Sequence, residues 1–210
     1  MWRVISSVFL ALSVGSPSPA NPQSQGEEIA RYATQEVRRF TAREARQGVA
    51  TSTDRLYAVN NSELAAYDRD TGERLAHWQG DPEWFPHLNS CTIITDELIC
   101  ANSNYPAVPM ASSIETFDAE TLAHKDSHSL GPLEGSLTWL VRHEGSWWAT
   151  FANYLGKGGQ PLRDHRATVL VRMDDTFTPQ ERWLFPESVV AEFAPYSSSG
   201  GDWVRMASYM

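Results

Sequence analysis

Polar side chains with the chemistry of a binding site gather in the middle of the sequence. They carry imidazole, amide or hydroxyl groups and fall where short apolar runs meet turns: His87, Asn89, Ser90, Asn102, Ser103, Asn104, Tyr105, Asn153 and Tyr154. His87 is the candidate general base, because imidazole titrates near neutral pH and can accept or donate a proton there. The competing interpretation is a histidine that is hydrogen-bonded for structure alone.

Asparagines end three similar runs, at Asn60, Asn102 and Asn153. We therefore expect their amides at one height around a repeated architecture, facing a central channel. Carboxamide oxygens suit a hard cation, so the sequence predicts Ca²⁺ bound by Asn102 and Asn153. The donors and acceptors of amides also suit a sugar or a lactone. The alternative is that these residues simply end strands in Asx turns.

Several other kinds of chemistry find no support. The sequence has no serine nucleophile elbow, phosphate-binding loop, dinucleotide fingerprint or paired-cysteine metal site. His124 and His128 would share one face of a strand, but a zinc site needs a third ligand. We expect at least one of Trp139, Trp147 and Trp148 to pack between sheets, whereas an exposed one would stack on a carbohydrate.

The elements that position these groups are short β-strands. Beyond residue 46 apolar and polar residues alternate, and Gly, Asp, Asn and Pro separate the runs. A turn, an apolar strand and an Asn recur at 53–60, 95–102 and 144–153, each followed by a strand and an Asp, at 64–73, 114–121 and 169–175. A period of roughly 40 to 55 residues with about four strands predicts the blades of an all-β propeller. A β-sandwich is the alternative.

Short motifs between Gln47 and Trp203 match a known group of proteins. They are His87-Leu88-Asn89-Ser90, Asn102-Ser103-Asn104-Tyr105-Pro106, Gly135-Ser136-Leu137-Thr138-Trp139, Trp147-Trp148, Phe151-Ala152-Asn153-Tyr154 and Tyr196 to Gly201. With them the chain resembles the secreted bacterial β-propellers often labelled cycloisomerase, which are related in shape to lactonase-type and quinoprotein-like propellers. Such a resemblance transfers a fold more securely than a reaction.

We expect an exported propeller whose channel mouth binds a small polar molecule, such as a lactone or a sugar acid. The expected ligand contacts, besides His87, are Asn89, Ser90, Asn102, Asn104, Tyr105, Trp139, Asn153, Tyr154 and Ser198. A sharper hypothesis is an isomerase or lactone hydrolase, in which His87 is the general base and an Asn-bound cation polarises the carbonyl. The rival is a non-catalytic recognition or scaffold propeller.

The N-terminal residues predict export. Residues 1–20 read as a signal peptide, with Arg3 before an apolar run and a small-residue cleavage site at Ser18-Pro19-Ala20. Residues 21–46 would form a linker with a short helix or strand, and 47–210 a partial propeller. No later apolar run is long enough to span a membrane. The expected location is the periplasm or the extracellular medium.

The net charge limits the possible partners, and the cysteines bear on the cellular compartment. A net charge of −9 without a Lys/Arg cluster argues against nucleic acid and anionic membranes as partners. Cys91 and Cys100 would meet an oxidising environment after export. With Asp96-Glu97 as the hairpin turn they would lie diagonally, about 7–8 Å apart, which is longer than a relaxed disulfide allows. A disulfide and two free thiols both remain open.

Residues 204–210 predict a shifted reading frame. The resembled family would continue after Trp203 with a Gly-Pro-Asp-Gly turn and a Leu-Leu-Tyr-Val strand. Loss of one G from GGT CCG GAT GGC CTC CTA TAT GTG A gives codons for Val-Arg-Met-Ala-Ser-Tyr-Met and a stop, which matches the end of the chain. We therefore expect a truncated or frameshifted product, an incomplete six- or seven-bladed propeller with an exposed apolar blade face.

Overall fold

The structure is a computed structural model that describes residues 35–132 and 134–203. These residues form three four-stranded antiparallel sheets. The predicted signal peptide, residues 21–34 of the predicted linker and the expected frameshift at 204–210 lie outside the described residues. None of the described helices is both long enough and apolar enough to cross a membrane.

Each sheet is a meander whose strands follow one another in sequence order. The first sheet is β1 (Gly48–Thr51), β2 (Arg55–Asn60), β3 (Glu63–Asp68) and β4 (Arg74–Gln79); the second is β5 (Leu88–Ile94), β6 (Glu97–Ser103), β7 (Ser112–Asp118) and β8 (His124–Gly131); the third is β9 (Ser136–His143), β10 (Ser146–Ala152), β11 (Val169–Met173) and β12 (Pro179–Leu184). The predicted repeat is confirmed, because its copies coincide with β2, β6 and β10 and are followed by β3, β7 and β11.

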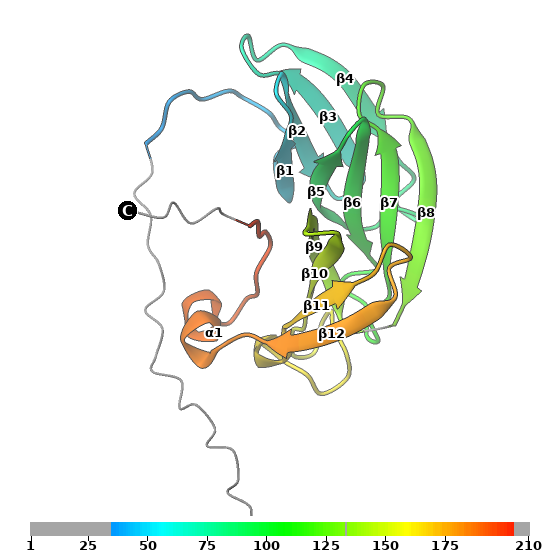
Figure 1. Cartoon of the computed structure of the whole chain (residues 1–210), viewed down its shortest axis with the longest axis vertical. Coiled ribbons are helices and arrows are strands. Elements are labelled where there is room, and N and C mark those ends of the chain that lie inside the picture. Colours follow the sequence, from blue (N-terminus) through cyan, green and yellow to red (C-terminus); the bar gives the residue numbers. More distant parts are fainter. Residues whose placement is uncertain (1–34, 133, 204–210) are drawn as a thin grey trace, which may run out of the picture. The chain divides into compact units, whose positions relative to one another are not determined.

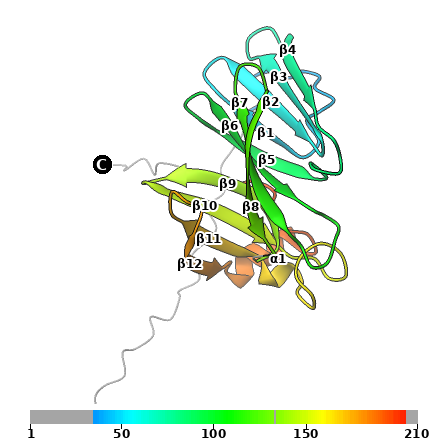
Figure 2. The same cartoon turned by 90° about the vertical axis from the view of Figure 1, so that its right-hand side faces the viewer.

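The three sheets are arranged about their first strands. β1 contacts β5 and β5 contacts β9, while β4, β8 and β12 lie outermost (Figure 1). Figure 2 shows the second sheet, β5 to β8, between the other two. A sandwich would place two sheets face to face as two layers. Meanders that pack side by side about their inner strands are instead the blades of a β-propeller, so the predicted fold class is confirmed with three blades in the described residues.

An aspartate holds the turn between the third and fourth strands of every blade. Asp118 Oδ1 accepts hydrogen bonds from the backbone N–H groups of Glu120 and Thr121 and from the Thr121 hydroxyl. Asp68 and Asp174 accept the same kinds of hydrogen bond in the other two blades. The hydrogen bonds from Thr121 lower the pKa of Asp118, because they stabilise the charged carboxylate. The recurring Asp is therefore the anchor of a repeated turn.

The second sheet is buried on both faces. Alternate residues of β6 point to opposite sides, so Leu98 and Cys100 belong to the core shared with the first sheet and Ile99 and Ala101 to the core shared with the third. Trp147 belongs to this second core and is 6% exposed. This confirms the expectation that a tryptophan packs between sheets. Burial of apolar surface between neighbouring blades thus holds them together.

Cys91 of β5 and Cys100 of β6 form a disulfide. The two residues stand directly opposite each other, with Cα atoms 4.0 Å apart. The predicted diagonal placement is wrong because the turn consists of Thr95 and Asp96, one residue earlier than expected, with Thr95 at a positive φ of 59°. A disulfide is consistent with an oxidising compartment; export itself remains a prediction.

Two further expectations differ from the structure. In the lead-in segment predicted to hold a short helix or strand, residues 35–42 form neither. A helix that the sequence pattern did not predict, α1 (Glu187–Phe193), follows Pro186 in a region expected to hold only strands and turns.

The shared face predicted for His124 and His128 is wrong. β8 contains an irregularity, so that His124 pairs with Phe117 and His128 with Ile114. Phe117 and Ile114 point to opposite sides of β7, and each belongs to a different core. The extra residue of the bulge therefore sends the two histidines to opposite faces.

Candidate functional site

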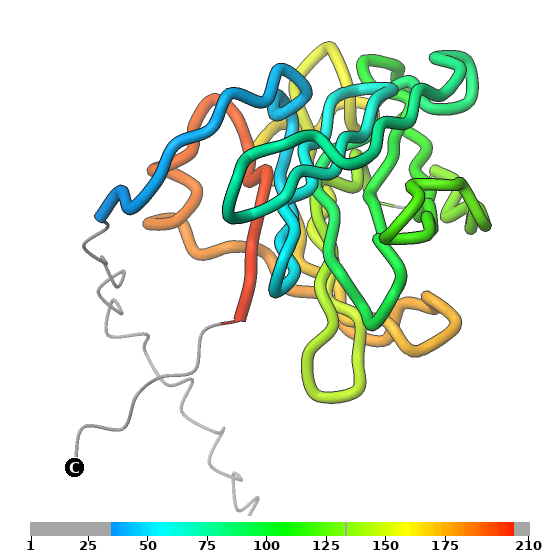
Figure 3. The backbone as a smooth tube through the Cα atoms, turned by 90° about the horizontal axis from the view of Figure 1, so that it is seen from above, coloured from blue at the N-terminus to red at the C-terminus, as the bar shows by residue number. Residues whose placement is uncertain are grey.

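A cavity of about 780 Å³ lies where the inner strands of the blades begin. Gln47 just before β1, Asn89 in β5, and Ser136 and Thr138 in β9 contribute to its lining. The segment that follows α1 adds Tyr196 and lies on the side of the inner strands in Figures 1 and 3. Residues from all three blades therefore meet at one site, as the channel position of a propeller requires.

Two amides hold the His87 ring at the edge of this cavity. His87 Nδ1 lies 2.9 Å from Asn61 Oδ1, and the Gln47 amide donates to the same oxygen at 2.8 Å. Because an amide oxygen only accepts, His87 carries its proton on Nδ1 and keeps the lone pair on Nε2. Burial lowers the pKa of His87, which favours the neutral ring. Nε2 can therefore accept a proton from a bound molecule or a water.

Three rings form one wall of the cavity. His87 stacks on Tyr105 with centroids 4.8 Å apart, and Tyr105 meets Tyr154 edge-on at 5.9 Å. Gly158 allows this arrangement, because a Cβ there would stand 2.4 Å from the Tyr105 ring and its φ is +60°. Burial raises the pKa of Tyr154, so its phenol stays protonated. Among the described residues nothing hydrogen-bonds to the hydroxyls of either tyrosine, which are thus available to a ligand.

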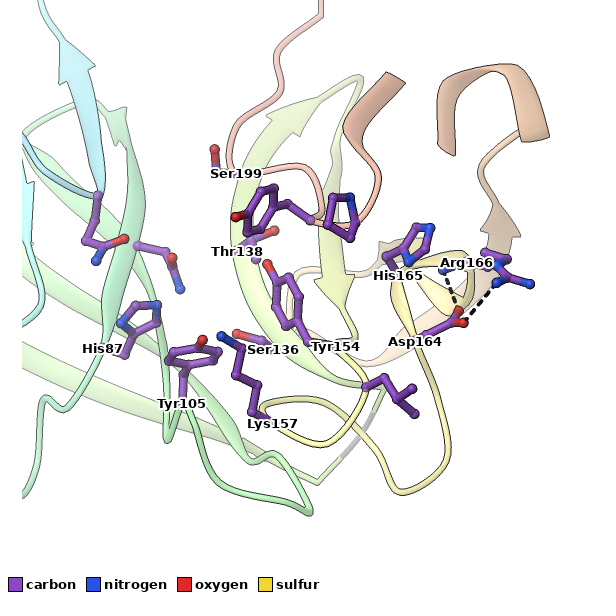
Figure 4. Close-up of a pocket in the computed structure, with 15 residues that line it drawn as sticks. His87, Tyr105, Ser136, Thr138, Tyr154, Lys157, Asp164, His165, Arg166 and Ser199 are labelled. Atoms are coloured by element: carbon purple, nitrogen blue, oxygen red, sulfur yellow. Dashed lines mark hydrogen bonds and ion pairs between the residues drawn. The ribbon is translucent and has the colours of Figure 1, made fainter. Parts of the chain in front are cut away.

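Cationic side chains outnumber anionic ones in the lining. Lys157 reaches toward the gap between Tyr105 and Tyr154 (Figure 4) and has no carboxylate partner within the described part of the chain. Arg166 is paired with Asp164, 3.5 Å away, on the turn that begins the 3₁₀ helix. One positive charge is left over in a chain whose net charge is −9. The lining of the cavity is therefore more positively charged than the protein as a whole.

The predicted site residues divide between this cavity and other places. His87, Asn89, Tyr105 and Tyr154 line it together. A second, smaller cavity of about 200 Å³ is lined by Asn102, Ser103 and Asn104 instead. Ser90 lies in β5, and Asn153 is fully buried; neither lines either cavity.

The amides of Asn102 and Asn153 are used inside the protein. Asn153 donates to two backbone carbonyls, and its Oδ1 accepts the N–H of Gln160 at 2.8 Å. The Oδ1 of Asn102 accepts the N–H of His87 at 3.4 Å. The described residues also contain no group of three or more His, Cys, Asp or Glu side chains that could hold a metal ion. Neither amide lines the larger cavity, so the cation site expected at Asn102 and Asn153 stays a prediction.

Trp139 and Ser198 contact each other and hold the segment that follows α1. The indole N–H of Trp139 donates to Ser198 Oγ at 2.9 Å, and the ring is only 7% exposed. Gly201 packs on the same ring, since a Cβ at that position would stand 2.5 Å from it. Both predicted contact residues therefore keep the segment after α1 against β9.

Several residues that build the site were not predicted from the sequence, among them Gln47, Asn61, Lys157, His165 and Arg166. Lys157 alone has a local signal. The glycines around it, Gly156, Gly158 and Gly159, all have positive φ and shape the loop that carries the amine. The others are brought to the cavity only by contacts between distant segments.

No protein-family model matches the sequence, and no curated protein is significantly similar to it. Among solved structures, BamB from Moraxella catarrhalis is 14% identical over 67% of this chain and 35% of its own, with a TM-score of 0.40. The quinohemoprotein alcohol dehydrogenases ADHIIG from Pseudomonas putida HK5 and from Comamonas testosteroni are 14% and 15% identical over 65% of this chain and 26% of theirs, with TM-scores of 0.44 and 0.42. The chain thus spans about a quarter to a third of these propeller proteins. Its own three blades carry the fold assignment.

Proposed function

We propose that the cavity binds a small hydroxylated carboxylic acid, of the sugar-acid kind, or the corresponding lactone. The observation that carries the proposal is the unpaired ammonium group of Lys157 beside the stacked rings of His87, Tyr105 and Tyr154. A carboxylate is the natural partner of such an amine. The faces of the rings and the phenol hydroxyls would contact the apolar and hydroxyl groups of the rest of the ligand.

Calorimetric titration with galacturonate, gluconate and neutral galactose tests this proposal. We expect the acids to bind and galactose to bind more weakly. Lys157→Gln should weaken acid binding about 10-fold to 100-fold, the cost of losing a charged hydrogen bond. Lys125→Gln is the matched control, because it removes the same charge from β8, outside the cavity. Equal affinity for galactose and the acids would contradict the proposal.

Lactone hydrolysis is a second candidate, favoured by the free Nε2 of His87. In this reaction His87 would take a proton from water, the resulting hydroxide would add to the lactone carbonyl, and the ring C–O bond would break with return of the proton to the leaving oxygen. The product is a hydroxy acid, the same class of anion that Lys157 would bind. The rival hypothesis is a propeller that recognises its ligand without changing it.

A pH-stat assay with glucono-δ-lactone separates the two candidates. Hydrolysis requires acid release faster than the spontaneous reaction and a loss of about 10²–10⁴ in rate for His87→Ala. If acid is released only at the spontaneous rate while gluconate still binds, the protein binds its ligand without hydrolysing the lactone.

A further inference from the structure

An exposed tryptophan stands on a fixed backbone outside the cavity described above. Trp84 is 72% exposed. Its backbone is nonetheless held, since the N–H donates to Asp81 O at 3.0 Å and the carbonyl accepts from Asn102 Nδ2 at 3.3 Å. An indole ring that gains so little from burial, yet is displayed on an anchored turn, is placed to contact something else.

The second cavity, of about 200 Å³, lies directly beside this ring. Trp84 lines it together with Glu83, Asn104 and serines that include Ser113 and Ser129. The carboxylate of Glu83 and the Nδ2 of Asn104 have no partner among the described residues. The cavity therefore offers a free acceptor and a free donor next to an exposed aromatic face.

We propose that Trp84 and this cavity bind a neutral carbohydrate. The C–H face of a pyranose ring can stack on the indole, while its hydroxyl groups hydrogen-bond to Asn104 and Glu83. The carboxylate of Glu83 makes the site unfavourable for sugar acids. It thus differs in ligand charge from the cavity at Lys157 and does not depend on the function proposed there.

The test is calorimetric titration of the protein with maltohexaose, cellohexaose and the β-1,4-linked N-acetylglucosamine hexamer. At least one hexasaccharide should bind with a dissociation constant in the millimolar range or below. Trp84→Ala should weaken that binding at least tenfold, and Trp84→Phe, which keeps an aromatic face, should restore it to within a few-fold. Failure of all three sugars to bind the wild-type protein overturns the proposal.

Two controls locate the effect. Trp183→Ala removes another partly exposed tryptophan, 39% exposed and outside this cavity, and should leave binding unchanged. Lys157→Gln should also leave hexasaccharide binding unchanged, so failure of the acid-binding proposal and failure of this one are distinguishable. An unaltered thermal midpoint for Trp84→Ala shows that the fold is intact. If Trp84→Ala binds as tightly as the wild-type protein, the site lies elsewhere and the proposal is wrong.

Discussion

At the scale of single residues, the chemistry of His87 depends on two neighbours that its own sequence motif does not contain. Asn61 Oδ1 fixes the position of the ring proton, and Gln47 fixes Asn61. Nε2, the ring nitrogen without a proton, is therefore a base rather than an acid in the free protein. The same logic explains why the asparagines could be noticed in the sequence but not assigned: a carboxamide can serve a ligand or its own backbone equally well, and Asn153 serves the backbone.

The half-buried, neutral ring of His87 predicts an acid-sensitive contribution to stability. Its pKa is lowered in the folded protein, so the unfolded chain takes up the proton first as the pH falls below about 6.5. The folded state then loses stability until the pH reaches the lowered pKa. We expect urea unfolding to show a larger loss between pH 7.5 and pH 5.5 for the wild-type protein than for His87→Gln. An identical pH dependence in both proteins would contradict a lowered pKa of His87 in the folded state.

At the scale of elements, the strands were predictable and their irregularities were not. The alternation of apolar residues and the recurring Asp located the central strands of each blade, because local sequence determines both. The turn of the β5–β6 hairpin was placed one residue too late, since Thr95 adopts a positive φ that a threonine rarely takes. The bulge in β8 likewise depends on the partner strand. Such one-residue shifts decide which side chains share a face.

The disulfide in this hairpin should contribute measurably to stability. Replacing both Cys91 and Cys100 by Ala should lower the free energy of unfolding by about 2–3 kcal/mol, because the reopened loop gains conformational freedom in the unfolded chain. Equilibrium unfolding in urea under oxidising conditions measures the difference. Wild-type protein kept in a strong reductant is the control, and it should lose a similar amount of stability. Equal stability of the double variant and the oxidised protein would contradict this expectation.

At the scale of the whole described unit, the full lining of the cavity could not be predicted because it is assembled from long-range contacts. Gln47, His87, Lys157 and Tyr196 are far apart in sequence and meet only once three blades are packed. The packing itself has a linear order, since the second blade shares one core with the first and a separate core with the third. Blades that touch only their neighbours should also lose stability locally.

Truncation of one core side chain should reveal this order. Phe151→Ala empties a fully buried position in the core shared by the second and third blades and should cost about 3–5 kcal/mol. Hydrogen exchange should accelerate most in β9 to β11 and least in β2 and β3. Phe117→Ala empties a position in the core shared by the first and second blades. In this variant hydrogen exchange should accelerate more in β2 and β3 than in β9 to β11. If either variant accelerated hydrogen exchange equally in all three blades, the blades would unfold as one cooperative unit and the prediction would be wrong.

The disulfide between Cys91 and Cys100 also depends on the register of the strands that carry it. The sulfur atoms meet only when β5 and β6 are aligned residue for residue as in the native sheet. A slip of one position would send one cysteine to the opposite face, where no bond could close. Because the second blade presents both of its faces to neighbours, a misaligned hairpin there would spoil two interfaces at once. The disulfide can therefore form only in molecules whose β5 and β6 already pair in the native register.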